Sequence, residues 1–239
     1  MLRKILFSFL WIAFLWGILD AQDLQSKNYP QDEQLILVGI GALNDGFYDI
    51  AEKQFSQFMK DYPNHEKGYE VCYLLGKTQF HKKKLRESKT LFLKILNEDK
   101  NFEYTDYTLY WLAEIEIRLG HGEEARKFLS SIVKRFPKFE WIDYAYYLSG
   151  LLDFESNRLS QAEASFKKVP LSSRNHELIQ ASLFWLGLSS FRQKDYEGTI
   201  RYLKNLWEDP KLLPKGYLRY ALFWLGEAQL RLGRFSDAT

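Results

Sequence analysis

Few side chains in this sequence have the type and spacing that catalysis needs. Gly76-Lys77-Thr78 has the composition that ends a phosphate-binding loop. Such a loop also needs a glycine five residues before Gly76, where Val71 stands, and a preceding strand. Because this segment has the pattern of a helix interior, we expect no nucleotide site here.

The histidines and the single cysteine are the remaining candidates for metal or nucleophilic chemistry. The histidines fall in or near different predicted turns, and no two have the spacing of a metal site. Cys72 lies in a column of core residues and is expected to pack as a small apolar side chain. No Gly-x-Ser-x-Gly motif is present. We therefore expect no catalytic residue, no metal and no cofactor. The four histidines are His65, His81, His121 and His176.

The overall composition excludes several classes of function. The chain has 33 basic and 31 acidic residues, a net charge of +2, which gives no electrostatic footprint for nucleic acid or an anionic membrane. Lys82-Lys83-Lys84 is accordingly interpreted as a solvated turn. With 46% hydrophobic residues the chain can bury a core, and its one cysteine excludes an intramolecular disulfide.

The N-terminus has the pattern of a targeting segment. Two basic residues, Arg3 and Lys4, precede the uncharged run from Ile5 to Leu19. This run suits a signal peptide and is short for a membrane span, which needs about 20 residues. We expect cleavage after Ala21 and a periplasmic protein with no membrane insertion after cleavage. The alternative is a retained inner-membrane signal anchor that faces the periplasm.

A small residue recurs along the rest of the chain at nearly constant spacing. Four successive steps are 37 residues long, and the last is 39. A second small column follows twelve residues after the first, and a large apolar column follows four residues later. Such spacing indicates repeated structural units. The columns are Gly39, Gly76, Ala113, Gly150, Gly187 and Gly226; Ala51, Ser88, Ala125, Ala162, Thr199 and Ala238; and Phe55, Phe92, Leu129, Phe166 and Leu203.

Each unit has the pattern of two helices joined by a short polar break. Apolar residues recur at three- and four-residue spacing around breaks such as Gly120-His121-Gly122. The second stretch ends at Tyr62-Pro63 in the first unit and at Phe136-Pro137 in the third, since proline cannot continue a helix. The small columns predict close helix crossings, and we expect the large column to fill the space between neighbouring hairpins.

This pattern resembles the tetratricopeptide repeat (TPR), whose signature is a large residue, then Leu-Gly, an aromatic, Ala, Phe and Pro in order. Leu37–Pro63 and Trp111–Pro137 match it nearly throughout. The resemblance extends from about Asp32 to the C-terminus and implies an all-α fold. The longer repeats that end in Tyr-Pro or Phe-Pro are similar to those of exported bacterial proteins of outer-membrane assembly and of the Tol–Pal machinery.

We predict a right-handed superhelical, all-α solenoid of antiparallel helix hairpins with a period of about 37 residues. Residues 1–21 form the signal peptide, 22–31 a linker and 32–239 the solenoid. Because Ala238 falls within a second helix, we expect the natural protein to continue beyond it. The predicted repeats are 32–68, 69–105, 106–142, 143–179, 180–218 and a partial repeat at 219–239.

The first helices of such hairpins line a concave groove, which here carries many aromatic residues. They form either a ladder that binds an apolar or extended peptide or rings that merely pack neighbouring helices. Charged residues of both signs border the groove: Lys77, Glu114, Arg118, Glu155, Arg192, Glu227 and Arg231. The predicted partner-binding residues are Tyr73, Phe80, Tyr107, Tyr110, Tyr144, Tyr147, Phe154, Phe184, Phe191, Tyr220 and Phe223.

The resemblance favours a non-catalytic scaffold of the bacterial cell envelope that binds a protein or peptide. One alternative is a glycan- or peptidoglycan-binding module, although Trp111, Trp185 and Trp224 lie next to core columns rather than at exposed positions. Another is the targeting arm of a larger enzyme that continues past Thr239. The sequence leaves the identity of the partner and the oligomeric state open.

Overall fold

The structure is a computed structural model that describes residues 29–99, 101–207 and 217–234. The predicted signal peptide and Ala238 lie outside this part of the chain. The described residues form helices and the turns between them, with no strand, so the predicted all-α class is confirmed. Among the helices described, none has the length and apolarity to cross a membrane.

The chain divides into two compact units, Met1–Lys83 and Lys84–Thr239. In the first unit α2 packs against α3, and α3 packs against α4. Phe55 and Phe58 of α3 are fully buried there. The helices of this unit are α2 (Gln31–Asn44), α3 (Tyr48–Asp61) and α4 (Gly68–His81).

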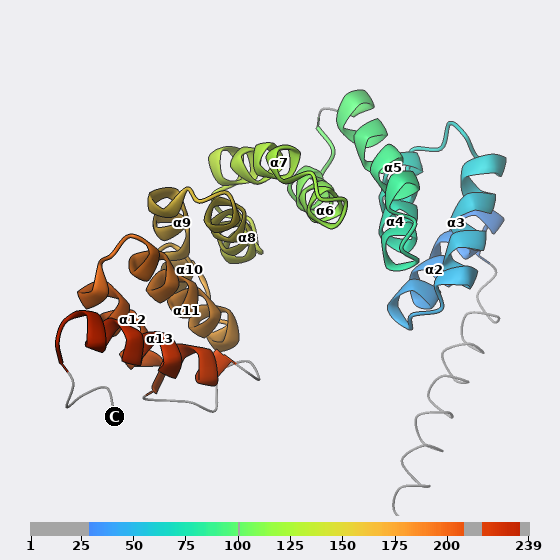
Figure 1. The fold of residues 1–239 in the computed structure, drawn as a ribbon. Helices are drawn as coiled ribbons and strands as arrows, with labels where there is room; N and C mark the ends of the chain where they lie inside the picture. Colours follow the sequence, from blue (N-terminus) through green and yellow to red (C-terminus); the bar gives the residue numbers. More distant parts are fainter. Residues whose placement is uncertain (1–28, 100, 208–216, 235–239) are drawn as a thin grey trace, which may run out of the picture. The chain divides into compact units, whose positions relative to one another are not determined.

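The second unit is a longer run of antiparallel hairpins in which successive helices pack side by side (Figure 1). In this unit, α6, α8, α11 and α13 are each the first helix of a repeat. Helix α11 contacts both α8 and α13. The elements are α5 (Leu85–Glu98), α6 (Thr105–Arg118), α7 (Gly122–Arg135), α8 (Ile142–Glu155), α9 (Leu159–Phe166), α10 (Val169–Ser172), α11 (His176–Arg192), α12 (Tyr196–Trp207) and α13 (Tyr217–Arg231).

The first helix of every repeat ends in a turn with one residue in the left-handed region. Glycine occupies it at Gly46, Gly120 and Gly233, with φ between 73° and 79°. Lysine or asparagine occupies it at Lys83, Asn157 and Lys194, with φ between 57° and 63°. These residues have the spacing of the small columns, so the repeat register predicted from the sequence is present in the backbone.

The small columns are sites of close helix contact, as predicted. A Cβ atom at Gly39 would lie 2.5 Å from the ring of Phe55, and one at Gly187 would lie 2.4 Å from Leu203. The prediction for the large column was incomplete, because Phe55, Phe166 and Leu203 each lie against the backbone of the small residue in their own hairpin. Phe166 then also joins a cluster with Leu186 of the next hairpin.

The second helix of the fourth repeat is interrupted. α9 ends at Phe166, and the short α10 begins at Val169 with Pro170 in its first turn. Proline has no amide hydrogen, and its ring clashes with the carbonyl four residues earlier, so a continuous helix is broken here. Val169 is nevertheless fully buried, so this position still contributes to the core.

Candidate partner-binding face

The predicted groove residues differ widely in exposure. Five are buried, with exposed fractions between 3% and 8%: Tyr73, Phe80, Tyr110, Phe154 and Phe184. Three are half-buried: Tyr107, Tyr147 and Phe191. Three are exposed, at 37%, 61% and 57%: Tyr144, Tyr220 and Phe223. A partner can therefore touch only part of this set directly, and the buried rings form the support beneath it.

The rings of α8 and α11 are joined in one continuous set of contacts. The indole Nε1 of Trp185 donates a hydrogen bond to the hydroxyl of Tyr147 at 3.2 Å. Trp185 also packs edge-on against Phe154, with ring centroids 4.9 Å apart. The guanidinium of Arg192 lies 3.9 Å above the centroid of Phe154. Two neighbouring repeats thus share one surface of fixed rings.

Two leucines complete this surface. Leu151 of α8 and Leu188 of α11 are half-buried and pack against the core cluster that contains Phe154 and Leu186. Burial raises the pKa of the Tyr147 hydroxyl, so that group stays neutral and remains a hydrogen-bonding group. We call the surface formed by Tyr147, Leu151, Phe154, Trp185, Leu188 and Arg192 the α8–α11 face.

Two further tyrosines of the predicted groove are held through their hydroxyl groups by residues near the end of their own predicted repeat. The hydroxyl of Tyr107 donates to a carboxylate oxygen of Glu140. That bond to a carboxylate, together with partial burial, raises the pKa of Tyr107 to about 12. The hydroxyl of Tyr144 accepts from Nδ2 of Asn175 at 2.9 Å. Both rings are therefore oriented before any ligand arrives.

The segments that join consecutive hairpins contribute aromatic rings that were not predicted from the sequence. Phe139, in the segment between α7 and α8, is only 3% exposed. It packs edge-on against Tyr107 at 4.9 Å, and Trp141 packs against Tyr110 at 5.2 Å. The extra residues of the 37-residue period thus fold beneath the tyrosines. The signal in the sequence was Phe102, which stands 37 residues before Phe139 and is also buried.

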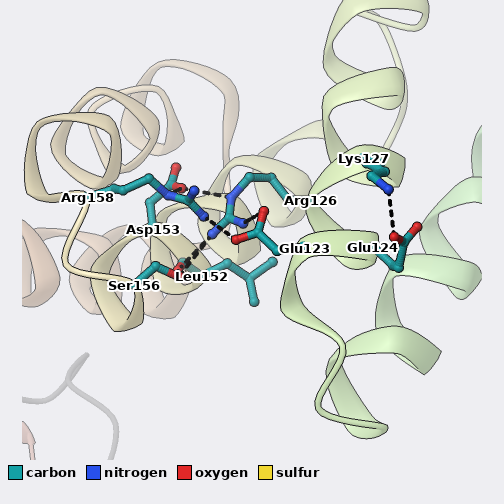
Figure 2. A network of polar contacts seen from close by, with 8 residues as sticks. All are labelled: Glu123, Glu124, Arg126, Lys127, Leu152, Asp153, Ser156 and Arg158. Atoms are coloured by element: carbon teal, nitrogen blue, oxygen red, sulfur yellow. Dashed lines mark hydrogen bonds and ion pairs between the residues drawn. The ribbon is translucent and has the colours of Figure 1, made fainter.

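A network of ion pairs joins α7, α8 and the turn before α9 (Figure 2). Arg126 Nε donates to Asp153 at 2.9 Å, and its Nη2 donates to the carbonyl oxygen of Leu152 at 3.0 Å. Arg158 contacts both Asp153 at 3.2 Å and Glu123 at 3.0 Å. Both arginines hold the pKa of Glu123 below its usual value. All of these contacts join groups of the protein itself, so we assign the network to the packing of neighbouring repeats.

In the preceding repeat, a buried carboxylate stands at the position equivalent to Asp153. Glu116 of α6 is fully buried, and its two oxygens lie 2.6 Å from Lys89 Nζ and 2.8 Å from His121 Nδ1. Burial opposes its ionisation, but these two partners hold the pKa of Glu116 below its usual value. The sequence signal was a polar column three residues after the small column, which we did not recognise: Gln79, Glu116, Asp153 and Ser190.

The structure also shows where the residues considered for metal, nucleotide or nucleophilic chemistry lie. In the described residues, no group of three or more His, Cys, Asp or Glu side chains is arranged to hold a metal ion. His65 contacts Asp32 at 3.1 Å, and His81 stacks on Tyr48. Lys77 lies on α4 over the ring of Tyr73, and burial lowers its pKa. Cys72 is fully buried, as its core position predicts.

Comparison with known proteins identifies the repeats. A family model for the tetratricopeptide repeat matches residues 107–138 and 181–211, which lie in the predicted third and fifth repeats. In these two segments the chain is similar to the tetratricopeptide repeat (TPR). No curated protein matches the sequence.

Solved structures share the TPR fold at low sequence identity. A tetratricopeptide repeat protein from Parabacteroides merdae is 18% identical, with a TM-score of 0.66, and the match covers 87% of this chain and 76% of that one. PilF of Pseudomonas aeruginosa is 13% identical with a TM-score of 0.65, covering 87% and 86%. MamA of Desulfovibrio magneticus RS-1 is 17% identical with a TM-score of 0.64, covering 76% and 96%. At these identities the likeness concerns the fold alone.

Proposed function

We propose that this chain is a scaffold that binds an extended segment of a protein partner along the first helices of its second unit. The observation that carries the proposal is the α8–α11 face, where Tyr147, Trp185, Phe154 and Arg192 form one connected surface. Leu151 and Leu188 add apolar area on the same two helices. The TPR fold supports a protein ligand over a small molecule.

The binding energy would come from burial of partner side chains against rings that are already ordered. Each ring is fixed by a hydrogen bond or an edge-on contact, as between Trp185 and Tyr147. A preformed surface loses little side-chain entropy when a ligand binds. Apolar burial contributes roughly 25 cal/mol for each Å² removed from water, so a short segment can be held without any structural change in the scaffold.

The proposed place of action is the bacterial cell envelope. The pattern of residues 1–21 supports export, as does the similarity of the repeats to those of exported envelope proteins. We expect a reporter that is active only after export to gain activity when it is fused behind residues 1–31. Substitution of Leu10 and Leu15 by arginine would interrupt the apolar run and should abolish that activity. Reporter activity that survives both substitutions would contradict export by this segment.

Photo-crosslinking in the producing cell tests the binding face. The photoreactive residue replaces Tyr144, because this side chain is 37% exposed and stands three residues before Tyr147 on α8, which places the two on the same side of the helix. The matched control replaces Lys167, which is exposed at the end of the second helix α9 and pairs with Glu163. The thermal melting of both variants is measured first, to establish that each is folded.

The proposal predicts a discrete protein adduct from position 144 and none of the same mass from position 167. Mass spectrometry of the adduct would identify the partner and the cross-linked segment. The same adduct from both positions would place the partner elsewhere on the protein. Absence of an adduct from position 144 in a folded variant would contradict binding at this face.

A further inference from the structure

Three arginines stand at the same place near the ends of the first helices α6, α11 and α13. Two of them have a glutamate four residues earlier: Arg118 Nε lies 3.7 Å from Glu114, and Arg231 Nη2 lies 4.0 Å from Glu227. The residue four positions before Arg192 is Leu188. Within the described residues, no carboxylate lies within ion-pair distance of Arg192.

Arg192 is nevertheless held in place. Its guanidinium stacks 3.9 Å above the ring centroid of Phe154, and its Nη1 donates to the carbonyl oxygen of Phe154 at 3.4 Å. Phe154 is buried, so the ring beneath the guanidinium is fixed. A stacked guanidinium keeps its remaining N–H groups free at its edge, where they match the two oxygens of a carboxylate. Arg192 itself is exposed to solvent.

We infer that Arg192 binds an aspartate or glutamate side chain of the partner segment, whose neighbouring apolar groups lie on Leu151 and Leu188. This inference rests on the proposed function and adds the chemistry of the partner. The third and sixth repeats pair their own arginines internally, and the fourth has Glu155 at this position, so the fifth repeat is where an external carboxylate is bound most favourably. A guanidinium already oriented by Phe154 loses little entropy on binding.

The carboxylate belongs to a side chain within the segment rather than to a chain end. α11 contacts α8 on one side and α13 on the other. Tyr144 on α8 and both Tyr220 and Phe223 on α13 are exposed. A segment that covers these residues must continue past Arg192 in both directions, which a chain terminus at Arg192 would not do.

Selection from random peptides provides ligands for the test. The peptides are displayed within a longer chain, so that none carries a free C-terminal carboxylate. Selected sequences are then synthesised with blocked ends, each as the acidic peptide and as its Asn or Gln counterpart, and fluorescence anisotropy gives both dissociation constants. We expect the acidic form to bind at least about tenfold more tightly to the unaltered protein.

Two pairs of variants identify the residue responsible. Leu188→Glu places a carboxylate four residues before Arg192, as in Glu114 and Arg118, and should abolish the preference for the acidic peptide. Leu188→Gln is its uncharged control and should retain the preference. Arg192→Gln should abolish the preference, whereas Arg118→Gln should leave it unchanged. Thermal melting establishes that every variant is folded.

Each outcome bears on the inference. An acidic preference that survives in both Arg192→Gln and Leu188→Glu would overturn the role of Arg192. Binding only of peptides with a free C-terminal carboxylate, tested with unblocked ends, would overturn the assignment to a side chain. Peptides that bind without acidic preference, yet weaken with Tyr144→Ala, would sustain the proposed function and refute this inference alone. Failure to select any peptide, or binding unaffected by Tyr144→Ala, would contradict both.

Discussion

Phe166 lies so close to the backbone of Gly150 that a Cβ atom there would be 2.5 Å from Cε1 of the ring. Phe166 is fully buried and cannot move outward. The same relationship joins Gly39 with Phe55 and Gly187 with Leu203. The crossing of the two helices in each of these hairpins therefore depends on a missing side chain, and the proposed binding face depends on the crossings at Gly150 and Gly187.

Gly150→Ala should destabilise the second unit even though alanine favours a helix. The added methyl group forces Phe166 or the helix backbone to shift, and such overpacking costs about 1–3 kcal/mol. Urea denaturation followed by circular dichroism measures the change in the free energy of unfolding. Gly187→Leu should lower the free energy of unfolding further. Its Cβ atom would already lie 2.4 Å from Leu203, and the rest of the leucine side chain needs still more space.

Gly122→Ala is the matched control in the same unit. Its Cβ would meet Leu152 at 3.5 Å, which is an ordinary contact, and Gly122 begins α7. We expect the free energy of unfolding to change by no more than about 0.5 kcal/mol. Equal losses from Gly122→Ala and Gly150→Ala would contradict the role of the small column.

Lys194→Gly should stabilise the protein. Lys194 has φ of 63°, in the left-handed region, where an L-residue is disfavoured by about 1–2 kcal/mol. The greater chain entropy of glycine offsets about half of this, which leaves a gain of roughly 0.5–1 kcal/mol. A rise in melting temperature tests the prediction. Gly120→Ala, at φ of 79°, should lower it by the converse effect.

Glu116→Gln should destabilise the protein at neutral pH by about 1–3 kcal/mol, because a buried charge-assisted contact to Lys89 and His121 is lost. The folded pKa of Glu116 lies below its unfolded value of about 4.3. Its stabilisation is therefore complete above that unfolded pKa and is lost as pH falls through the folded pKa. The difference in unfolding free energy between the two proteins should therefore shrink as the pH falls below about 4.3. A difference that is constant with pH would refute the assignment.

Asp153→Asn and Glu123→Gln should differ in effect although both residues pair with Arg126 and Arg158. The side chain of Asp153 is 11% exposed, whereas that of Glu123 is 70% exposed. We expect a loss of about 1–3 kcal/mol for Asp153→Asn and a clearly smaller loss for Glu123→Gln, because solvent screens an exposed ion pair. Chemical denaturation of both variants measures this, and equal losses would show that burial does not set the strength of the network.

The repeat register was predictable because it depends on contacts within one hairpin. A glycine at Gly150 and a large residue at Phe166 are visible in the sequence as two columns with constant spacing. The turn residues follow the same period, including Lys194 at a position where glycine would be expected. The break at Pro170 was also within reach, since proline interrupts a helix wherever it occurs in the interior.

The exposure of each ring was not predictable, because it depends on residues outside its own hairpin. Tyr107 and Tyr144 occupy the same position in their helices, yet Tyr107 is covered by Phe139 and Trp141 and Tyr144 is left exposed. The sequence placed Trp185 next to a core column, and in the structure it is half-buried and contacts both Tyr147 and Phe154. These differences in exposure depend on side chains that lie more than one helix away along the chain, and no local sequence pattern indicates them.

Hydroxyl-radical footprinting with the cross-linked partner, or with a selected peptide, tests the central claim most directly. The method reports the solvent exposure of individual side chains. We predict slower oxidation of Tyr144, Leu151 and Leu188 in the complex, and no change at Leu171, which is 81% exposed on α10. Unchanged oxidation of all three residues, together with protection of Leu171, would contradict binding at the α8–α11 face.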